Sequence, residues 1–215
     1  MWADTSVSTT ARVGAVMWLV QPLTVLAEFI AAARVTVPYS FVDNTISDLG
    51  ASTCTSIEYP FGPVPVCSPW HSLLNGSFII LGFFLALGAI LIRRLLPPGP
   101  AATTSVVLWM ISGLSSIATG LVPLDQDLIL HVLVSEPVFY AQPLAIITLG
   151  LAFRPHRPAL AWSGLAVGAI TLAGTAAFLA RPDSPNLGGL LERVALWPGY
   201  VWIAIVAIAV LRAPR

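Results

Sequence analysis

Six long apolar stretches constrain this chain more than any other feature of its sequence. A helix needs about 20 mostly apolar residues to cross the roughly 30 Å of hydrocarbon in a bilayer. The stretches of this length are residues 12–34, 71–92, 102–122, 131–153, 159–180 and 194–211. Only 9% of the 215 residues are charged, which is too few for a surface that faces water. The sequence therefore predicts an all-α bundle of six transmembrane helices, forming a single domain over residues 1–215.

The first stretch is interpreted as a retained helix, although a cleaved signal peptide is the alternative. The three alanines at 31–33 would suit a cleavage site. However, the apolar segment is longer than the roughly 7–15 residues of a typical signal sequence, and it contains Gln21 and Glu28. We therefore expect it to remain in the protein.

Arginine placement predicts the orientation of the bundle. Cytoplasmic loops carry an excess of basic residues. Seven arginines fall on the side of both termini, and three fall on the other: positions 12, 93, 94, 154, 157, 212 and 215 against 34, 181 and 193. The acids at 43, 48, 58, 125, 127, 183 and 192 all fall on the side with few arginines. This pattern predicts a cell-membrane protein with both termini in the cytoplasm.

A long loop at about 35–68 then lies outside the cell and carries both cysteines, Cys54 and Cys67. An oxidising exterior permits a disulfide between them. Two unpaired thiols are the alternative, and the bridge is the interpretation favoured here.

Polar residues within the spans collect near their outer ends. Polar side chains are costly in lipid and normally face the interior of a bundle. Glu28, Asp48, His71, His131 and Glu136 all lie at this end. Asn75 follows His71 by four residues, so both share one helix face. The inner half of the spans is mostly apolar, so we expect a cavity open toward the outer leaflet and lidded by the long loop.

Aromatic residues are expected at the depth of this cavity. They include Trp70, Phe139, Tyr140, Trp197 and Tyr200. An interfacial aromatic belt, which membrane proteins commonly have, is the interpretation favoured for most of them. As a group they are candidates for contact with a bound substrate.

Four local strings carry a family resemblance over nearly the whole chain. They are NTISDLG at 44–50, HSLLNGSFIILG at 71–82, GLVPLDQDLILH at 120–131 and GLLERVALWPGYVWI at 189–203. Together they resemble domain-of-unknown-function family 998, small bacterial and archaeal membrane proteins. The resemblance implies about six helices. It also implies a link to small membrane cyclases that close prenyl chains into rings.

The first functional hypothesis is therefore a cyclase acting on a lipophilic isoprenoid. Protonating an alkene or epoxide needs a carboxylic acid that stays protonated, and apolar burial favours that form. Glu136 and Glu28 are the candidate proton donors. Asp48, His71 and His131 are the candidates for orienting an acid or removing the final proton.

Two other hypotheses remain open. A carrier for a small lipophilic or cationic solute could use the same intramembrane acids, although the chain shows no internal repeat. A non-catalytic lipid-binding or assembly protein would use the polar residues only to hold helices together. Under that reading Asp48 pairs with Arg193, His131 bonds to Ser135 or to a loop carbonyl, and Glu192 is structural.

Several site classes are not indicated by the sequence. No His-Glu-x-x-His spacing or similar zinc motif occurs, and no glycine-rich phosphate loop or serine nucleophile elbow is present. The formal net charge of 0 argues against nucleic-acid binding. We expect no metal and no redox or nucleotide cofactor. The expected partners are a lipophilic small molecule and membrane lipid.

Overall fold

The computed structural model describes residues 7–181, 184 and 186–213 of the chain. Arg215 and Asp183, which contributed to the charge comparison above, lie outside these residues. All structural statements below refer to the described part of the chain.

Six helical spans, each long and apolar enough to cross a bilayer, confirm the predicted fold class. The first span combines α1 (Thr9–Leu19) and α2 (Leu23–Ala32). The others are α3 (His71–Ile92), α4 (Pro100–Leu121), α5 (Leu128–Phe153), α6 (Pro158–Leu179) and α7 (Gly188–Leu211). Two short 3-10 helices, η1 (Ser47–Gly50) and η2 (Arg93–Leu95), lie in the connections.

The first span is broken in the middle, which the sequence analysis did not anticipate. Pro22 has no backbone N–H, so it cannot continue the hydrogen-bond ladder of α1. Gln21 lies at the break, where its side-chain amide donates to Met17 O in the same helix and to Leu81 O in α3. Trp18 also donates to α3, at Leu85 O. Two polar side chains thus fix the elbow against the second span.

The last span begins at Gly188, six residues before the start predicted from hydropathy. The predicted span at 194–211 leaves Glu192 and Arg193 just outside the apolar stretch, where charges are less costly. In the structure both are buried within α7, because partners from other segments satisfy them. Charge pairing therefore extends this helix beyond its apolar core.

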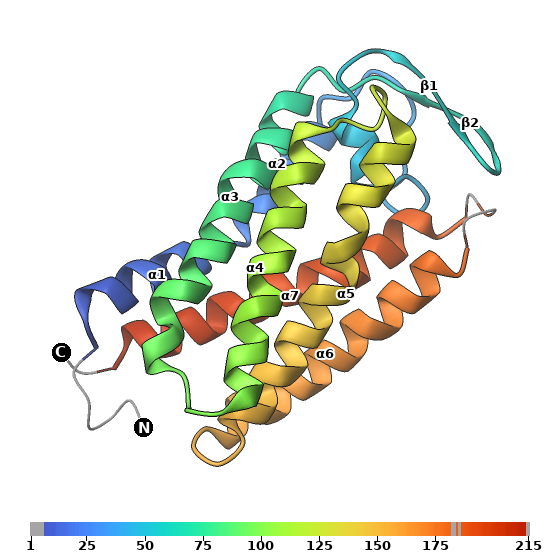
Figure 1. The fold of residues 1–215 in the computed structure, drawn as a ribbon. Helices are drawn as coiled ribbons and strands as arrows, with labels where there is room; N and C mark the ends of the chain where they lie inside the picture. The colour runs from blue at the N-terminus through green and yellow to red at the C-terminus, as the bar shows by residue number, and fades with distance from the viewer. Residues whose placement is uncertain (1–6, 182–183, 185, 214–215) are drawn as a thin grey trace.

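The spans form a ring in chain order (Figure 1). Each of α3 to α7 contacts the next, and α1 contacts both α3 and α7. Arg12 donates to the carbonyls of Leu211 and Ala213, which ties the start of α1 to the end of α7. We call this the terminal end of the bundle. The opposite end, where α3, α5 and α7 begin, is called the hairpin end.

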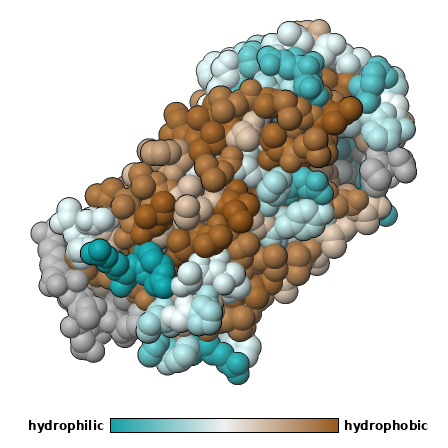
Figure 2. Space-filling model, viewed as in Figure 1, coloured by the Kyte–Doolittle hydropathy of each residue, from teal (hydrophilic) through white to brown (hydrophobic). Residues whose placement is uncertain are grey.

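The half of the bundle near the terminal end is tightly packed. Its core includes the fully buried rings of Trp18, Trp109, Phe153 and Trp202. The first two lie with their ring centroids 6.0 Å apart. On the face seen in Figure 2, hydrophobic side chains dominate the surface of the spans and form a broad band between more polar ends. This is the surface expected of a protein that faces lipid.

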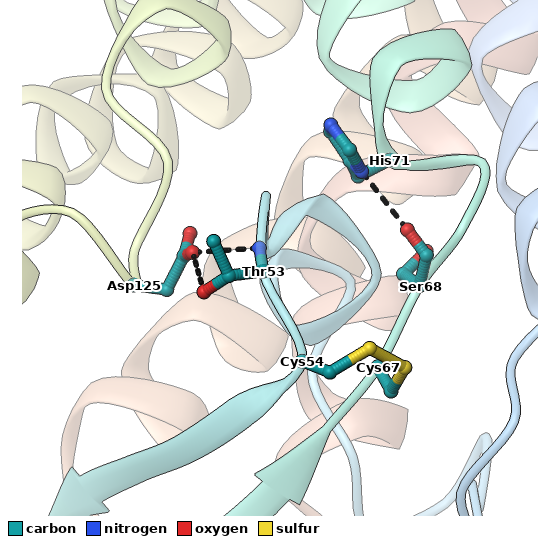
Figure 3. The surroundings of a disulfide bond; sticks show 6 residues. All are labelled: Thr53, Cys54, Cys67, Ser68, His71 and Asp125. Carbon is teal, nitrogen blue, oxygen red and sulfur yellow. Dashed lines mark hydrogen bonds between the residues drawn. A yellow bond between two sulfur atoms is a disulfide. The ribbon is translucent and has the colours of Figure 1, made fainter.

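The long loop contains a two-stranded antiparallel sheet, an addition to the all-α prediction. Strand β1 (Thr55–Tyr59) pairs with β2 (Gly62–Val66), and Thr55 lies opposite Val66. Cys54 and Cys67, which flank this first pair of the ladder, form a disulfide, so the predicted bridge is confirmed (Figure 3). The bridge closes the base of the hairpin.

Asp125, in the turn before α5, holds the base of the hairpin against the bundle. Its carboxylate accepts hydrogen bonds from the backbone N–H groups and the hydroxyls of Ser52 and Thr53, at 2.8–2.9 Å. Figure 3 shows the two bonds from Thr53 beside the disulfide. Burial alone would raise the pKa of Asp125, but these bonds favour the charged form and hold the pKa below its ordinary value.

Candidate functional site

A cavity of about 210 Å³ lies among the helices in the half of the bundle near the hairpin end. Helices α3 to α7 and the long loop all contribute to it. Its lining is Thr45, Ser47, Tyr59, Phe78, Ser116, Thr119, Leu124, Leu128, His131, Val132, Ser135, Glu136, Val138, Phe139, Phe178, Leu179, Glu192, Leu196 and Tyr200. Most of these side chains are apolar or aromatic. The lining includes two carboxyl groups and one imidazole, but no arginine.

Glu192 brings a buried carboxyl group to the cavity from the first turns of α7. Its Oε2 accepts a hydrogen bond from the backbone N–H of Ile46 at 2.6 Å, so the long loop is anchored directly to it. No other hydrogen bond among the described residues reaches this carboxyl group. One of its oxygens therefore has no donor among the described residues, and a bound molecule could pair with it.

His131, in the first turn of α5, lines the cavity with both ring nitrogens engaged. Nδ1 contacts the carbonyl oxygen of Val122 at 2.5 Å, and Nε2 contacts Ser47 Oγ at 3.0 Å. A carbonyl can only accept, so Nδ1 carries a proton. In the neutral ring, Nε2 then accepts from the Ser47 hydroxyl. The expected bond to a loop carbonyl is confirmed, whereas Ser135 bonds to Val132 O within its own helix.

Glu136, one turn further along α5 than Val132, also lines the cavity and is half-buried. Its Oε1 accepts a hydrogen bond from Tyr140 Oη at 3.1 Å, one helical turn further along. Tyr140 itself is 47% exposed on the outer surface of the bundle. The carboxyl group of Glu136 therefore lies between the cavity and the exterior.

Glu28 lies in a polar cluster beside the cavity but is not among its lining residues. Its Oε1 accepts from Arg193 Nε at 2.8 Å, and its Oε2 accepts from Trp197 Nε1 at 2.9 Å. Arg193 also donates to the carbonyls of Phe41 and Asn44. This buried ion pair gives Glu28 a charged partner, an arrangement that favours the carboxylate over the acid.

The expected pair between Asp48 and Arg193 is wrong, because Glu28 occupies the arginine and Asp48 has other donors. Asp48 accepts from Tyr59 Oη at 2.6 Å and from the backbone N–H of Thr45 at 2.9 Å. Burial raises the pKa of Asp48, and these hydrogen bonds oppose the shift. Burial and the neighbouring Asp48 also raise the pKa of Tyr59, so its phenol stays protonated and able to donate. Asp48 thus orients a cavity-lining ring without lining the cavity.

The remaining predicted residues lie away from the cavity. His71 contacts Ser68 O through Nδ1 at 3.0 Å (Figure 3). Asn75 donates to Gly50 O at 2.8 Å, and Trp70 is exposed beside the guanidinium of Arg34. Of these three residues, Asn75 ties the start of α3 to the loop. Trp197 belongs to the Glu28 cluster described above.

The structure therefore brings four of the predicted residues together in one cavity: His131, Glu136, Phe139 and Tyr200. The carboxyl group of Glu192, interpreted as structural from the sequence, joins them. Spacing could have revealed it, because Glu192, Leu196 and Tyr200 recur every four residues and so share one face of α7.

No group of three or more His, Cys, Asp or Glu side chains that could hold a metal ion occurs among residues 7–181, 184 and 186–213. The only buried ion pair in this part of the chain is the one between Glu28 and Arg193. The cavity chemistry available from the protein is thus that of carboxyl, imidazole, hydroxyl and aromatic groups.

Comparison with known proteins gives one match. A family model described as "Protein of unknown function (DUF998)" matches residues 18–209. No curated protein and no solved structure matches the chain.

Proposed function

This chain belongs to the DUF998 family, and we propose that it is a membrane-embedded enzyme that cyclises a lipophilic isoprenoid by donating a proton. One observation carries the proposal. The cavity is predominantly apolar, yet Glu136 and Glu192 both line it and no arginine does. Apolar surroundings generally favour the protonated form of a carboxylic acid, which is the form that a proton donor needs.

The chemistry balances without a co-reactant. A carboxyl group gives its proton to a terminal alkene or to an epoxide oxygen, which leaves a carbocation on carbon. The π electrons of a second double bond attack that cation and form the ring bond. Loss of a proton from the neighbouring carbon restores a double bond. The carboxylate, or His131 when its Nε2 is free of Ser47, can accept that proton. The net change is an isomerisation.

Aromatic rings in the cavity support this chemistry. Phe78, Phe139, Phe178, Tyr59 and Tyr200 all line it. The rings of Phe139 and Phe178 are stacked, with centroids 5.2 Å apart. An aromatic face attracts a cation by about 0.5–2 kcal/mol, so several rings around one cavity would lower the energy of a carbocation at successive positions. Exclusion of water by the apolar lining would protect the cation from hydration.

The packing of the other half of the bundle favours an enzyme over a carrier. A carrier needs a path from its site to each side of the membrane. Between the cavity and the terminal end lie the fully buried rings of Trp18, Trp109 and Trp202. A site that is closed at this end suits a reaction in which substrate and product use the same entrance.

We also propose that the protein lies in the cell membrane with both termini in the cytoplasm and the hairpin end outside. Arginines at the terminal end, including Arg12, Arg93 and Arg154, support this orientation. The Cys54–Cys67 disulfide at the hairpin end supports it as well, since disulfides persist in oxidising compartments. Single cysteines placed in the two connections at the terminal end should react with a membrane-impermeant thiol reagent only after the cells are opened.

The experiment that tests the function uses the purified protein in lipid nanodiscs with a prenylated indole or its epoxide. Wild-type protein should yield a cyclic isomer of the substrate. Glu192→Gln and Glu136→Gln keep the hydrogen-bond acceptors but lack an acidic proton. Because general acid catalysis contributes about 100-fold or more, loss of the donor should lower the rate by about that factor. Glu58→Gln, an exposed change on the hairpin, is the matched control.

The outcomes separate the hypotheses. Unchanged substrate with wild-type protein and with a panel of longer prenyl chains would overturn the cyclase proposal. Full activity in both glutamine variants would overturn the assignment of the acid. Uptake of a lipophilic cation into vesicles that depends on a proton gradient would instead support a carrier.

A further inference from the structure

A second hollow meets the cavity at Glu136. It is a groove of about 400 Å³ on the outer surface, between the middle of α4 and α5. Its lining is Leu108, Ile111, Glu136, Pro137, Tyr140, Ala141 and Leu144. Glu136 is the one residue that lines both hollows. The carboxyl group thus stands where an internal space and a surface groove adjoin.

The groove lies on a surface that faces lipid. Ile111, Tyr140 and Leu144 are each at least 40% exposed, and they belong to spans long enough to cross the bilayer. Figure 2 shows a small hydrophilic patch interrupting the hydrophobic band of this face of the bundle. Glu136 is eight residues from the start of α5, which places it about 12 Å along the helix. A carboxyl group at that depth is costly, and such groups usually have a role.

Helix α5 contains a proline directly after Glu136. Pro137 has no N–H to donate within the helix, and Val138 N donates to Ser115 Oγ of α4 at 3.1 Å. Ser115 Oγ in turn donates to Val134 O at 2.6 Å. One hydroxyl from α4 therefore links two backbone groups of α5, Val134 O and Val138 N, at the level of the groove.

We propose that this groove is a lateral portal, through which a chain-like lipophilic ligand passes between the surrounding lipid and the cavity. Glu136 and Tyr140 form its polar mouth. A carboxyl group can accept a hydrogen bond in either protonation state, and the acid form can also donate one, so the mouth favours a chain that carries a hydroxyl group, which can do both. The inference deepens the proposed function, since it names the route and the polar group of the same substrate. The occupant is a membrane-dissolved chain, because every other lining side chain is apolar or aromatic.

The test measures access to the cavity and needs no turnover. Both native cysteines are in the disulfide, so Thr119→Cys places one reactive thiol in the cavity lining. A long-chain N-alkyl maleimide dissolved in the bilayer should label it faster than a charged maleimide in water. Ile111→Trp and Leu144→Trp fill the groove and should each slow the lipophilic reaction by about tenfold. Ile170→Trp, an equally exposed position on α6 outside the groove, should leave the rate unchanged.

Competition tests the polar mouth. A long-chain alcohol should slow labelling of Thr119→Cys by the lipophilic maleimide, whereas the alkane of equal length should not. With Glu136→Leu in addition, alcohol and alkane should act alike.

Three results would overturn the portal. The charged maleimide could react as fast as the lipophilic one, which would show entry from water. The groove-filling variants could label at the wild-type rate. They could also change the oligomeric state with labelling unaffected, which would assign the groove to a second copy of the chain. If the protein is labelled as expected but forms no cyclic product, the portal proposal would be supported and the cyclase proposal would be overturned.

Discussion

Arg193 Nε donates to Glu28 Oε1 at 2.8 Å, which joins the last span to the first through a buried ion pair. The two residues are 165 positions apart in the chain. Arg193 also donates to backbone carbonyls of the long loop at Phe41 and Asn44. One guanidinium thus connects three segments beside the cavity. Removing one member of such a pair leaves the other charge buried without a partner.

Glu28→Gln is therefore expected to destabilise the fold. The loss should be about 3–5 kcal/mol, the usual cost of an unpaired buried charge. Detergent-induced unfolding in mixed micelles, followed by circular dichroism, measures it. The control is Glu58→Gln, which removes an exposed carboxylate and should change little. Equal unfolding midpoints for the two variants would contradict the structural role of the pair.

Gly82→Ala should weaken the contact between α3 and α4. A Cβ on Gly82 would lie 2.7 Å from the carbonyl oxygen of Gly113 and 3.0 Å from Ser116 Cβ, so the backbones would have to separate. We expect a cost of about 1–3 kcal/mol, as for other overpacked positions. Gly76→Ala, in the same helix with no atom near the added Cβ, should instead stabilise by about 0.5–1 kcal/mol. The free energy of unfolding of both variants, measured under the same conditions, tests this. An equal loss of stability in both would contradict the close contact at Gly82.

Asp125 should make the attachment of the hairpin depend on pH. Its pKa is lowered in the folded protein, so its stabilising effect is complete above the ordinary value of about 3.9 and is lost as the pH falls through the lowered pKa. Asp125→Asn should increase amide hydrogen exchange of Ser52 and Thr53 at neutral pH. The difference from wild type should shrink steadily below about pH 4. A difference that stays constant down to pH 2 would contradict this account.

The disulfide should restrain the hairpin. Cys54 and Cys67 are 13 positions apart, and closure of a loop of this size contributes about 3 kcal/mol. The Cys54→Ser/Cys67→Ser double variant should therefore show faster amide exchange in β1 and β2, while the spans stay protected. Alkylation should add no mass to the wild-type protein without reductant and should modify both cysteines after reduction. Modification before reduction would count against the bridge.

The spans could be predicted from the sequence because a backbone in lipid must satisfy its own hydrogen bonds, which few structures other than a helix can do. Each long apolar stretch had to become a helix. The predicted helix boundaries were wrong where polar residues interrupt an apolar stretch. The first span was predicted as one continuous stretch because most residues on both sides of Gln21 and Pro22 are apolar. The predicted start of α7 is too late because charged side chains are costly inside a span unless they have partners. The partners of Glu192 and Arg193 lie far away in the chain, so the sequence does not identify them.

The site was predictable only in part. Glu136 and His131 could be predicted because a polar side chain in an apolar stretch is costly in lipid and normally faces the interior of the bundle. The partner of Arg193 was mistaken, since both Glu28 and Asp48 lie at the correct end and only the rotation of each helix decides between them. The hairpin was missed because its strands are five residues long and contain Pro63 and Pro65, which weaken any strand pattern.

The ring of helices has a consequence for biosynthesis. The side chains of Glu192, Leu196 and Tyr200, and the counter-charge for Glu28, come from α7, which leaves the ribosome after the other five described spans. A nascent chain with five spans inserted therefore holds a carboxyl group in its first span without its cationic partner. Unpaired intramembrane charges of this kind are strongly disfavoured. A chain that lacks α7 is thus chemically distinguishable from one with all six described spans, and arrival of α7 completes the cavity and removes that mark in the same step.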